Sequence, residues 1–178
     1  MTSRRAGLIL VAVLLTGCAG MRGGGNQAGV AEIRNASGQS VGTARFTQAG
    51  NVVRILVEAK GLPPGPHGAH VHAVGKCDPP DFNSAGPHFN PTNKQHGALN
   101  PQGSHAGDLP NLTVGPDGTG RMETTTEQLS LGSGPSSVWD ADGSALVVHA
   151  NADDFKTDPT GNSGARVACG VLVKAPGR

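Results

Sequence analysis

The sequence predicts an all-β domain, and three observations lead to that class. The 178 residues include 28 glycines and 13 prolines, which would interrupt long helices every few residues. Several short segments alternate apolar and polar residues with the period of two that is typical of half-buried strands. Clusters of Gly, Asn, Asp, Ser and Pro separate these segments and mark turns. The formal net charge is only +1, so the chain has no basic surface for nucleic acid, and we expect no such partner.

The strand pattern is clearest in two places, where apolar side chains recur at every second position over 53–59 and again over 167–173. Ala145–His149 is a further expected strand, with Val147 and His149 on one face. Shorter strands are expected in four more segments: Ala31–Asn35, Val41–Phe46, Leu112–Val114 and Arg121–Thr125. No segment shows a helical period. The pattern therefore predicts a β-sandwich or barrel of short antiparallel strands.

The N-terminal segment indicates export. Two arginines precede an apolar run over Ala6–Thr16, which is too short to span a bilayer but suits a secretory signal. The letters LTGC at 15–18 resemble the bacterial lipoprotein box, in which cleavage leaves a cysteine that then carries lipid. The alternative is an ordinary signal peptide with Cys18 near the cleavage site by chance. We expect a lipoprotein of the cell envelope, periplasmic or on the outer face of a membrane, held there by the N-terminal lipid alone.

Export also determines the expected division of the chain and the expected state of its cysteines. We expect a signal peptide over residues 1–17, a lipidated Cys18 with a Gly-rich tether over 18–29, and one domain over 30–178. With Cys18 carrying lipid, Cys77 and Cys169 remain as an even pair in an oxidising compartment. These two cysteines are therefore predicted to form a disulfide.

One stretch, Ala73–Asn111, has almost no strand signal and is rich in Pro, Asn, Gly and His. A compact domain rarely keeps so long a loop unless the loop is functional or is held by a cross-link or a metal. Most of the chain's histidines lie in or beside it: His70, His72, His88, His96 and His105. An isolated buried histidine is usually a hydrogen-bonded core residue, but that explanation does not account for a group clustered in one loop.

The spacing of these histidines points to a metal. His70 and His72 share one face of a strand, His149 lies on another expected strand, and Asp108 follows His105 by three residues. Imidazoles with one carboxylate suit zinc, while imidazoles without a carboxylate suit copper. The pattern therefore predicts a histidine-based transition-metal site, which can hold one metal or two.

Five segments, in this order along the chain, resemble the copper/zinc superoxide dismutase family: Gly68–His72, Ser84–Pro91, His96–Gly97, His105–Leu109 and Gly161–Gly170. The resemblance extends from about Ala31 to Val173. It implies an eight-stranded Greek-key β-barrel or sandwich of immunoglobulin-like architecture, with long metal-binding and electrostatic loops. It also implies a superoxide dismutase, an oxidoreductase that converts superoxide to oxygen and hydrogen peroxide at a copper centre bridged to a structural zinc.

The resemblance further implies a role for each matching residue. The copper ligands would be His70, His72, His88 and His149. The zinc ligands would be His88, His96, His105 and Asp108. Two residues would act on the substrate, namely His88 as the metal bridge and proton carrier and Arg166 as the docking group for the anion. Asp153 would link the metal sites through ligand imidazoles, Cys77 and Cys169 match the family's disulfide, and the remaining His67 is expected to be structural.

Two other functions are weighed against this one. A non-catalytic exported copper/zinc-binding module of the same fold would not need Arg166 beside a complete set of copper ligands. A zinc hydrolase would need an open coordination position next to a general base, whereas the implied zinc site is closed by four ligands. The sequence leaves a homodimer open.

Overall fold

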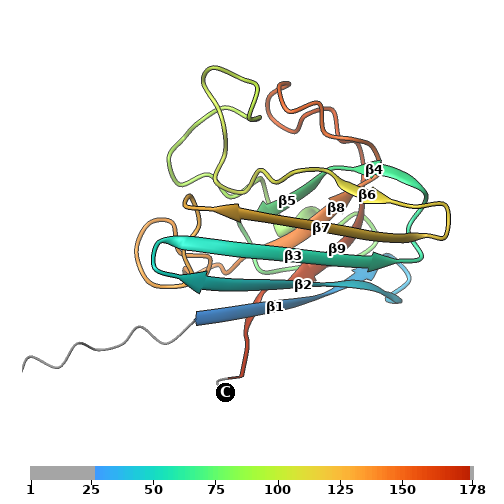
Figure 1. Ribbon diagram of the computed structural model, residues 1–178, viewed down its shortest axis with the longest axis horizontal. Helices are drawn as coiled ribbons and strands as arrows, with labels where there is room; N and C mark the ends of the chain where they lie inside the picture. The colour runs from blue at the N-terminus through green and yellow to red at the C-terminus, as the bar shows by residue number, and fades with distance from the viewer. Residues whose placement is uncertain (1–26, 177–178) are drawn as a thin grey trace, which may run out of the picture.

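A computed structural model describes residues 27–176, and short strands carry nearly all of its regular structure (Figure 1). The strands are β1 (Gln27–Asn35), β2 (Ser40–Ala49), β3 (Val52–Lys60), β4 (Gly65–His67), β5 (Ala69–His72), β6 (Leu112–Val114), β7 (Thr119–Thr126), β8 (Ala145–His149), β9 (Arg166–Val171) and β10 (Val173–Lys174). Within this range the only helical element is a 3-10 turn at Asn83–Ala85. None of the described residues belongs to a helix long and apolar enough to cross a membrane.

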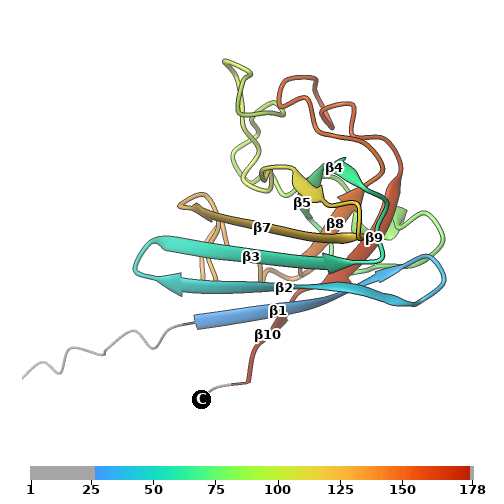
Figure 2. The same ribbon diagram turned by 45° about the vertical axis from the view of Figure 1, so that its right-hand side comes forward.

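The sheet closes on itself through one continuous piece of chain. Its strand order is β4-β6-β7-β3-β2-β1-β9-β8-β5, with β10 paired to β1. β4 and β5, at the two ends of this order, are separated only by Gly68, so the segment Gly65–His72 pairs with β6 along its first part and with β8 along its second. Counting β4 with β5 and β9 with β10 gives the expected eight strands, and the predicted antiparallel barrel is confirmed (Figure 2).

The alternating segments form strands where the sequence predicts them. In β3, Val53, Ile55 and Val57 are fully buried while Arg54 and Glu58 are exposed. β6 and β8 have the expected boundaries. β1, β2 and β7 extend a few residues beyond the segments predicted, because backbone pairing continues past the last residue of the alternating pattern.

Strand β1 includes three residues that the sequence assigns to the tether. Gln27, Ala28 and Gly29, assigned from the sequence to the tether, pair with β2 as part of β1. A methyl group on Gly29 would lie 2.9 Å from Cη2 of Trp139, so the missing side chain makes room for the indole ring. The signal peptide over 1–17, Cys18 and the rest of the tether lie outside the described residues.

The C-terminal strand differs from its predicted pattern. The alternation placed Val167, Cys169, Val171 and Val173 together on one face. In the structure, Ala168 and Leu172 lie in the main core, while Val173 is 52% exposed. The reason is that β9 is covered on both sides, since Cys169 packs outside the barrel in a second cluster with Phe82, Ala85, Ala145 and Val147.

The two faces of β5 have different environments. Ala69 and Val71 point into the main core, so His70 and His72 point outward from the barrel wall. The long loop after β5 covers them, and isolated bridges join His70 to Asp108 and His72 to His88. The barrel core thus forms without these histidines, which lie between the wall and the loop.

Gly107 sets how closely this loop approaches the barrel. Its N–H donates to the Phe89 carbonyl at 2.9 Å, and its own carbonyl accepts the Val71 N–H at 2.9 Å. A side chain at this position would collide with the Val71 carbonyl oxygen and would lie 3.1 Å from the Phe89 nitrogen.

We therefore expect Gly107→Ala to lower the free energy of unfolding by about 1–3 kcal/mol, the usual cost of forcing an extra group into a packed interior. Chemical denaturation of the variant tests this. Gly132→Ala is the matched control, because its added methyl would meet only side-chain atoms, the Ser130 hydroxyl at 3.3 Å and the Gln27 amide at 3.6 and 4.0 Å. Equal stability of the two variants would contradict the argument.

Candidate metal centre

All seven histidines of the chain are buried, none more than 6% exposed. Six of them gather in one region outside the barrel wall, and the ring centroids of His70 and His88 are only 4.0 Å apart. They form two clusters that share His88, and His70 lies within reach of both. β5 and β8 supply His70, His72 and His149, while the loop after β5 supplies His88, His96 and His105.

The first cluster consists of four imidazoles: His70, His72, His88 and His149. Each has one buried ring nitrogen without a hydrogen-bond partner, namely Nδ1 of His70 and Nε2 of the other three. A buried polar atom left without a partner is costly, so four such atoms in one group indicate a ligand that would satisfy them. Because no carboxylate is among them, the group fits copper.

The second nitrogen of each ring is fixed. His70 Nε2 lies 2.8 Å from Asp153 Oδ2, His72 Nδ1 lies 2.8 Å from the Gly86 carbonyl, and His149 Nδ1 lies 3.1 Å from the Gly164 carbonyl. Such contacts set both the ring orientation and the tautomer. Burial lowers the pKa of His149 to about 3 and that of His88 to about 4, so both rings are neutral at neutral pH.

The second cluster surrounds one carboxylate oxygen. Oδ1 of Asp108 lies 3.0 Å from His88 Nδ1, 3.0 Å from His96 Nδ1 and 3.2 Å from His105 Nδ1. The Nδ1 atoms of His88 and His105 are 3.3 Å apart. Around a tetrahedral zinc ion with bonds near 2.0–2.1 Å, neighbouring ligand atoms are about 3.3 Å apart, so this set has the dimensions of a zinc site.

His70 also comes within reach of His88, His96 and Asp108. Its Nε2 is already bonded to Asp153, however, and its Nδ1 is one of the four unpaired atoms of the first cluster. His105 directs its Nδ1 at Asp108, so we place His105 in the second cluster.

Charge in the second cluster is balanced by Asp108. Burial by itself would raise the pKa of Asp108, but hydrogen bonds from His105, His88 and His96 hold it well below its usual range. Burial would likewise lower the pKa of His96, yet its contacts with Asp108 and Asp153 raise that pKa to about 9. Oδ2 of Asp108 accepts the N–H groups of Gly97 and His105 at 2.9 and 3.0 Å, which fixes the carboxylate in place.

Asp153 lies between the two clusters. Oδ2 contacts His70 Nε2 at 2.8 Å and Oδ1 contacts His96 Nε2 at 3.0 Å, with the carboxylate fully buried. Its main chain is held by Asn111, whose side chain bonds to both the N–H and the carbonyl of Asp153. The structure thus brings Asp153 to one histidine of each cluster.

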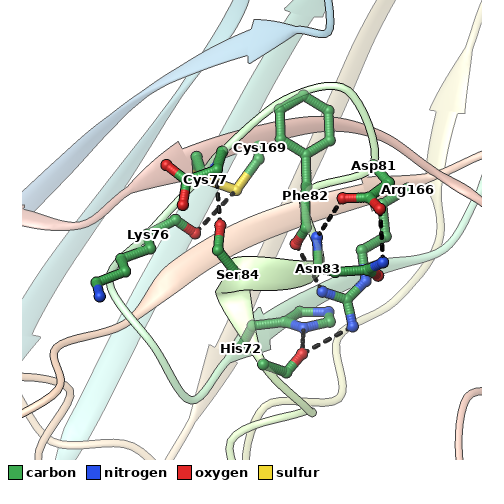
Figure 3. Close-up of a disulfide and its surroundings, with 11 residues drawn as sticks. His72, Lys76, Cys77, Asp81, Phe82, Asn83, Ser84, Arg166 and Cys169 are labelled. Atoms are coloured by element: carbon green, nitrogen blue, oxygen red, sulfur yellow. Dashed lines mark hydrogen bonds between the residues drawn. A yellow bond between two sulfur atoms is a disulfide. The ribbon is translucent and has the colours of Figure 1, made fainter.

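Arg166 lies beside His72 of the first cluster, and the disulfide lies in the same region (Figure 3). The guanidinium donates to the carbonyls of Phe82 and Gly86, both at 2.7 Å. The Gly86 carbonyl also accepts from His72, so it joins Arg166 to the first cluster. Cys77 and Cys169 form the predicted disulfide, which ties the loop carrying these carbonyls to β9.

An open cavity leads to this region. His88, His105 and Arg166 line it, together with Asp140 and Asp142 from the loop before β8. Arg166 and the shared His88 thus border the same open cavity.

His67 belongs to neither cluster. Its ring nitrogens lie 2.7 Å from the His149 carbonyl and 2.8 Å from the Pro63 carbonyl. These contacts are with main chain alone and tie the end of β8 to the segment before β4, which agrees with a structural residue.

Several residues that shape the site were missed from the sequence. Gly86 and Gly164 act through backbone carbonyls, for which residue type gives no signal. Asn111 anchors Asp153 across 42 positions of the chain, and Asp158 accepts the His96 N–H at 2.6 Å. Only the fold brings such distant residues together.

The barrel and the two clusters define a β-barrel protein built to hold a pair of transition-metal ions. The family model for "Copper/zinc superoxide dismutase (SODC)" matches residues 40–172. "Superoxide dismutase [Cu-Zn] 1" of Aquifex aeolicus is 46% identical over 144 residues, covering 80% of this chain and 85% of that protein. The corresponding Deinococcus radiodurans protein is 40% identical over 177 residues and covers 93% of each chain.

Among solved structures, a crystal structure of a SOD-like protein from Bacillus subtilis has a TM-score of 0.78 and 42% identity, covering 81% of this chain and 97% of that one. A double mutant of the same protein gives a TM-score of 0.76 and 44% identity, with 81% and 96% covered. The chain belongs to the copper/zinc superoxide dismutase family.

Removing the disulfide should loosen the loop that carries the Arg166 acceptors. We expect the double substitution of Cys77 and Cys169 by Ser to lower the free energy of unfolding by about 2–5 kcal/mol. Chemical denaturation of both proteins measures the change. A double mutant as stable as the parent would show that the contacts of Phe82 and Ala85 hold this loop without the cross-link.

Proposed function

We propose that the protein converts superoxide to oxygen and hydrogen peroxide, using copper and zinc. The observation that carries this is the shared ring of His88, whose Nδ1 faces the Asp108 cluster while its Nε2 is an unpaired atom of the first cluster. One ring between an all-imidazole group and a carboxylate-containing group suits two different metals. We assign copper to His70, His72, His88 and His149, and zinc to His88, His96, His105 and Asp108.

Copper supplies the one-electron redox chemistry, which zinc with its closed d shell cannot. Arg166 binds and orients the superoxide anion, because its guanidinium lines the cavity with His88 and is held rigidly by two carbonyls. Nε2 of His88 is the atom that takes up and releases a proton. Nδ1 of the same ring faces the second cluster, so Nε2 is the ring nitrogen left for a proton.

A non-catalytic metal-binding module of this fold is disfavoured by the same cavity. Storage of a metal does not require a fixed guanidinium beside the ligands, whereas docking a small anion does. A zinc hydrolase is disfavoured because Asp108 and three histidines would supply all four zinc ligands, which leaves no coordination position for water.

The function is tested with His70→Ala. His70 contributes one of the four unpaired nitrogens, so we expect the variant to lose copper and dismutation activity while it retains zinc. Metal analysis and a dismutation assay of the purified variant measure both. Loss of zinc with copper retained would overturn the assignment of the two clusters.

Zinc binding to the metal-free protein should release protons. The pKa of His96 is raised to about 9, so its ring is protonated at pH 7, and a zinc ligand must be neutral. His88, with its pKa lowered to about 4, is already neutral. We expect His96 to release about one proton on zinc binding at pH 7, and this release to disappear as the pH rises through about 9.

Calorimetry in buffers of different ionisation enthalpy measures this release. A proton count that does not depend on pH between 7 and about 10 would contradict the role of His96.

We further propose that the mature chain is exported and anchored through lipid on Cys18. Support comes from the two arginines, the apolar run over Ala6–Thr16 and the LTGC sequence at 15–18. The disulfide of the structure is of the kind that persists in oxidising compartments outside the cytoplasm.

Cys18→Ser should therefore move the protein from the membrane fraction to the soluble fraction, with unchanged specific activity, because Cys18 precedes the domain. Fractionation of expressing bacteria followed by immunoblotting tests this. A variant that stays with the membranes would show that something other than lipid on Cys18 holds the chain there.

Whether the chain forms a homodimer is left open by the sequence. Sedimentation of the metal-loaded protein at several concentrations decides it. A monomer mass at every concentration would contradict a homodimer.

A further inference from the structure

The loop between β8 and β9 packs against the loop that carries the second cluster. The two stand side by side at one end of the barrel in both views (Figures 1 and 2). The Leu99 N–H donates to the Phe155 carbonyl at 2.9 Å, and the Asn100 side chain donates to the Lys156 carbonyl at 3.4 Å. The β8–β9 loop is therefore hydrogen-bonded to the segment between His96 and His105 of the second cluster.

Asp158 in this loop reaches two histidines of that cluster with one oxygen atom. Its Oδ1 accepts the backbone N–H of His96 at 2.6 Å and lies 3.8 Å from Nε2 of His105. Asp154 and Lys156 of the same loop make no such contact. The Asp154 carboxylate instead accepts hydrogen bonds from Lys156, Thr157 and Asn162 within its own loop.

The second ring nitrogens of the cluster show what Asp158 can do. All three histidines direct Nδ1 at Asp108. Of their Nε2 atoms, that of His88 belongs to the first cluster and that of His96 contacts Asp153 at 3.0 Å. The carboxylate that Nε2 of His105 approaches is that of Asp158. Histidines that bind a metal usually donate their other N–H to such a group, which fixes the ring.

We propose that Asp158 is a positioning residue for the zinc site, one that holds the main chain of His96 and accepts the Nε2–H of His105 when Nδ1 of His105 binds zinc. This deepens the proposed function and rests on its assignment of zinc to the second cluster. The carboxylate of Asp158 is 47% exposed, so its effect belongs at the lower end of the range for such partners, about 10-fold in metal affinity.

The test measures zinc affinity of the zinc-loaded protein by competition with a chelator. We expect Asp158→Ala to bind zinc about 10-fold more weakly. Asp158→Asn keeps an oxygen for the His96 N–H but loses the charge that faces His105, so it should fall between Asp158→Ala and the parent. Asp154→Ala is the matched control, because it removes a carboxylate from the same loop without touching either histidine, and it should bind zinc as the parent does.

A second readout separates positioning from general support of the loop. In the zinc-loaded parent, the Nε2–H of His105 should exchange slowly with solvent in nitrogen-15 NMR spectra, and this exchange should accelerate in Asp158→Asn. If Asp158→Asn matches the parent in both affinity and exchange, the residue only anchors the main chain and the proposal fails. Equal loss of zinc in Asp154→Ala and Asp158→Ala would overturn it as well.

Neither readout depends on turnover. If Asp158→Ala does not fold, Asp158→Asn decides the question. A parent protein that binds zinc in this way but does not dismutate superoxide would refute the proposed function and leave the role of Asp158 standing.

Discussion

Six imidazole rings share one buried region of this protein, and hydrogen bonds to the carboxylates of Asp108 and Asp153 offset the free-energy cost of burying them together. Buried imidazoles resist protonation and repel one another when charged, while each unpaired ring nitrogen adds a cost of its own. Asp108 faces three of the rings, and Asp153 contacts one ring of each cluster. Among the described residues, the fully buried ring nitrogens without partners are those of the first cluster, which a bound ion would satisfy.

The barrel supports this network from outside its core. Ala69 and Val71 fill the interior, and this fixes the outward direction of His70 and His72 on the same strand. The loop that covers them has no strand pairing of its own beyond isolated bridges, and it is held by the disulfide, by the contacts of Gly107 and by Arg166. A rigid wall with a cross-linked cover keeps the ligand atoms in place, which is what a preorganised metal site requires.

Much of this could be predicted from the sequence, because alternation and spacing are local signals. Alternation predicts the strands over 53–59 and 145–149, and the period of a strand predicts that His70 and His72 share one face. Composition assigns Gly29 to the tether, whereas in the structure it belongs to β1 and packs under Trp139. Alternation does not predict which side chains of β9 are buried, because both of its sides are covered. Backbone acceptors such as the Gly86 carbonyl, and partners such as Asn111 and Asp158, depend on the tertiary fold and have no local signal.

The central claim is that the ring of His88 joins the two clusters. Electron paramagnetic resonance of the protein with copper in the first cluster and cobalt(II) in the second tests it most directly. If His88 bonds to both ions through its two nitrogens, the unpaired electrons couple through the ring and the copper signal is lost. A copper signal as strong as in the cobalt-free protein, with both metals bound, would contradict the account.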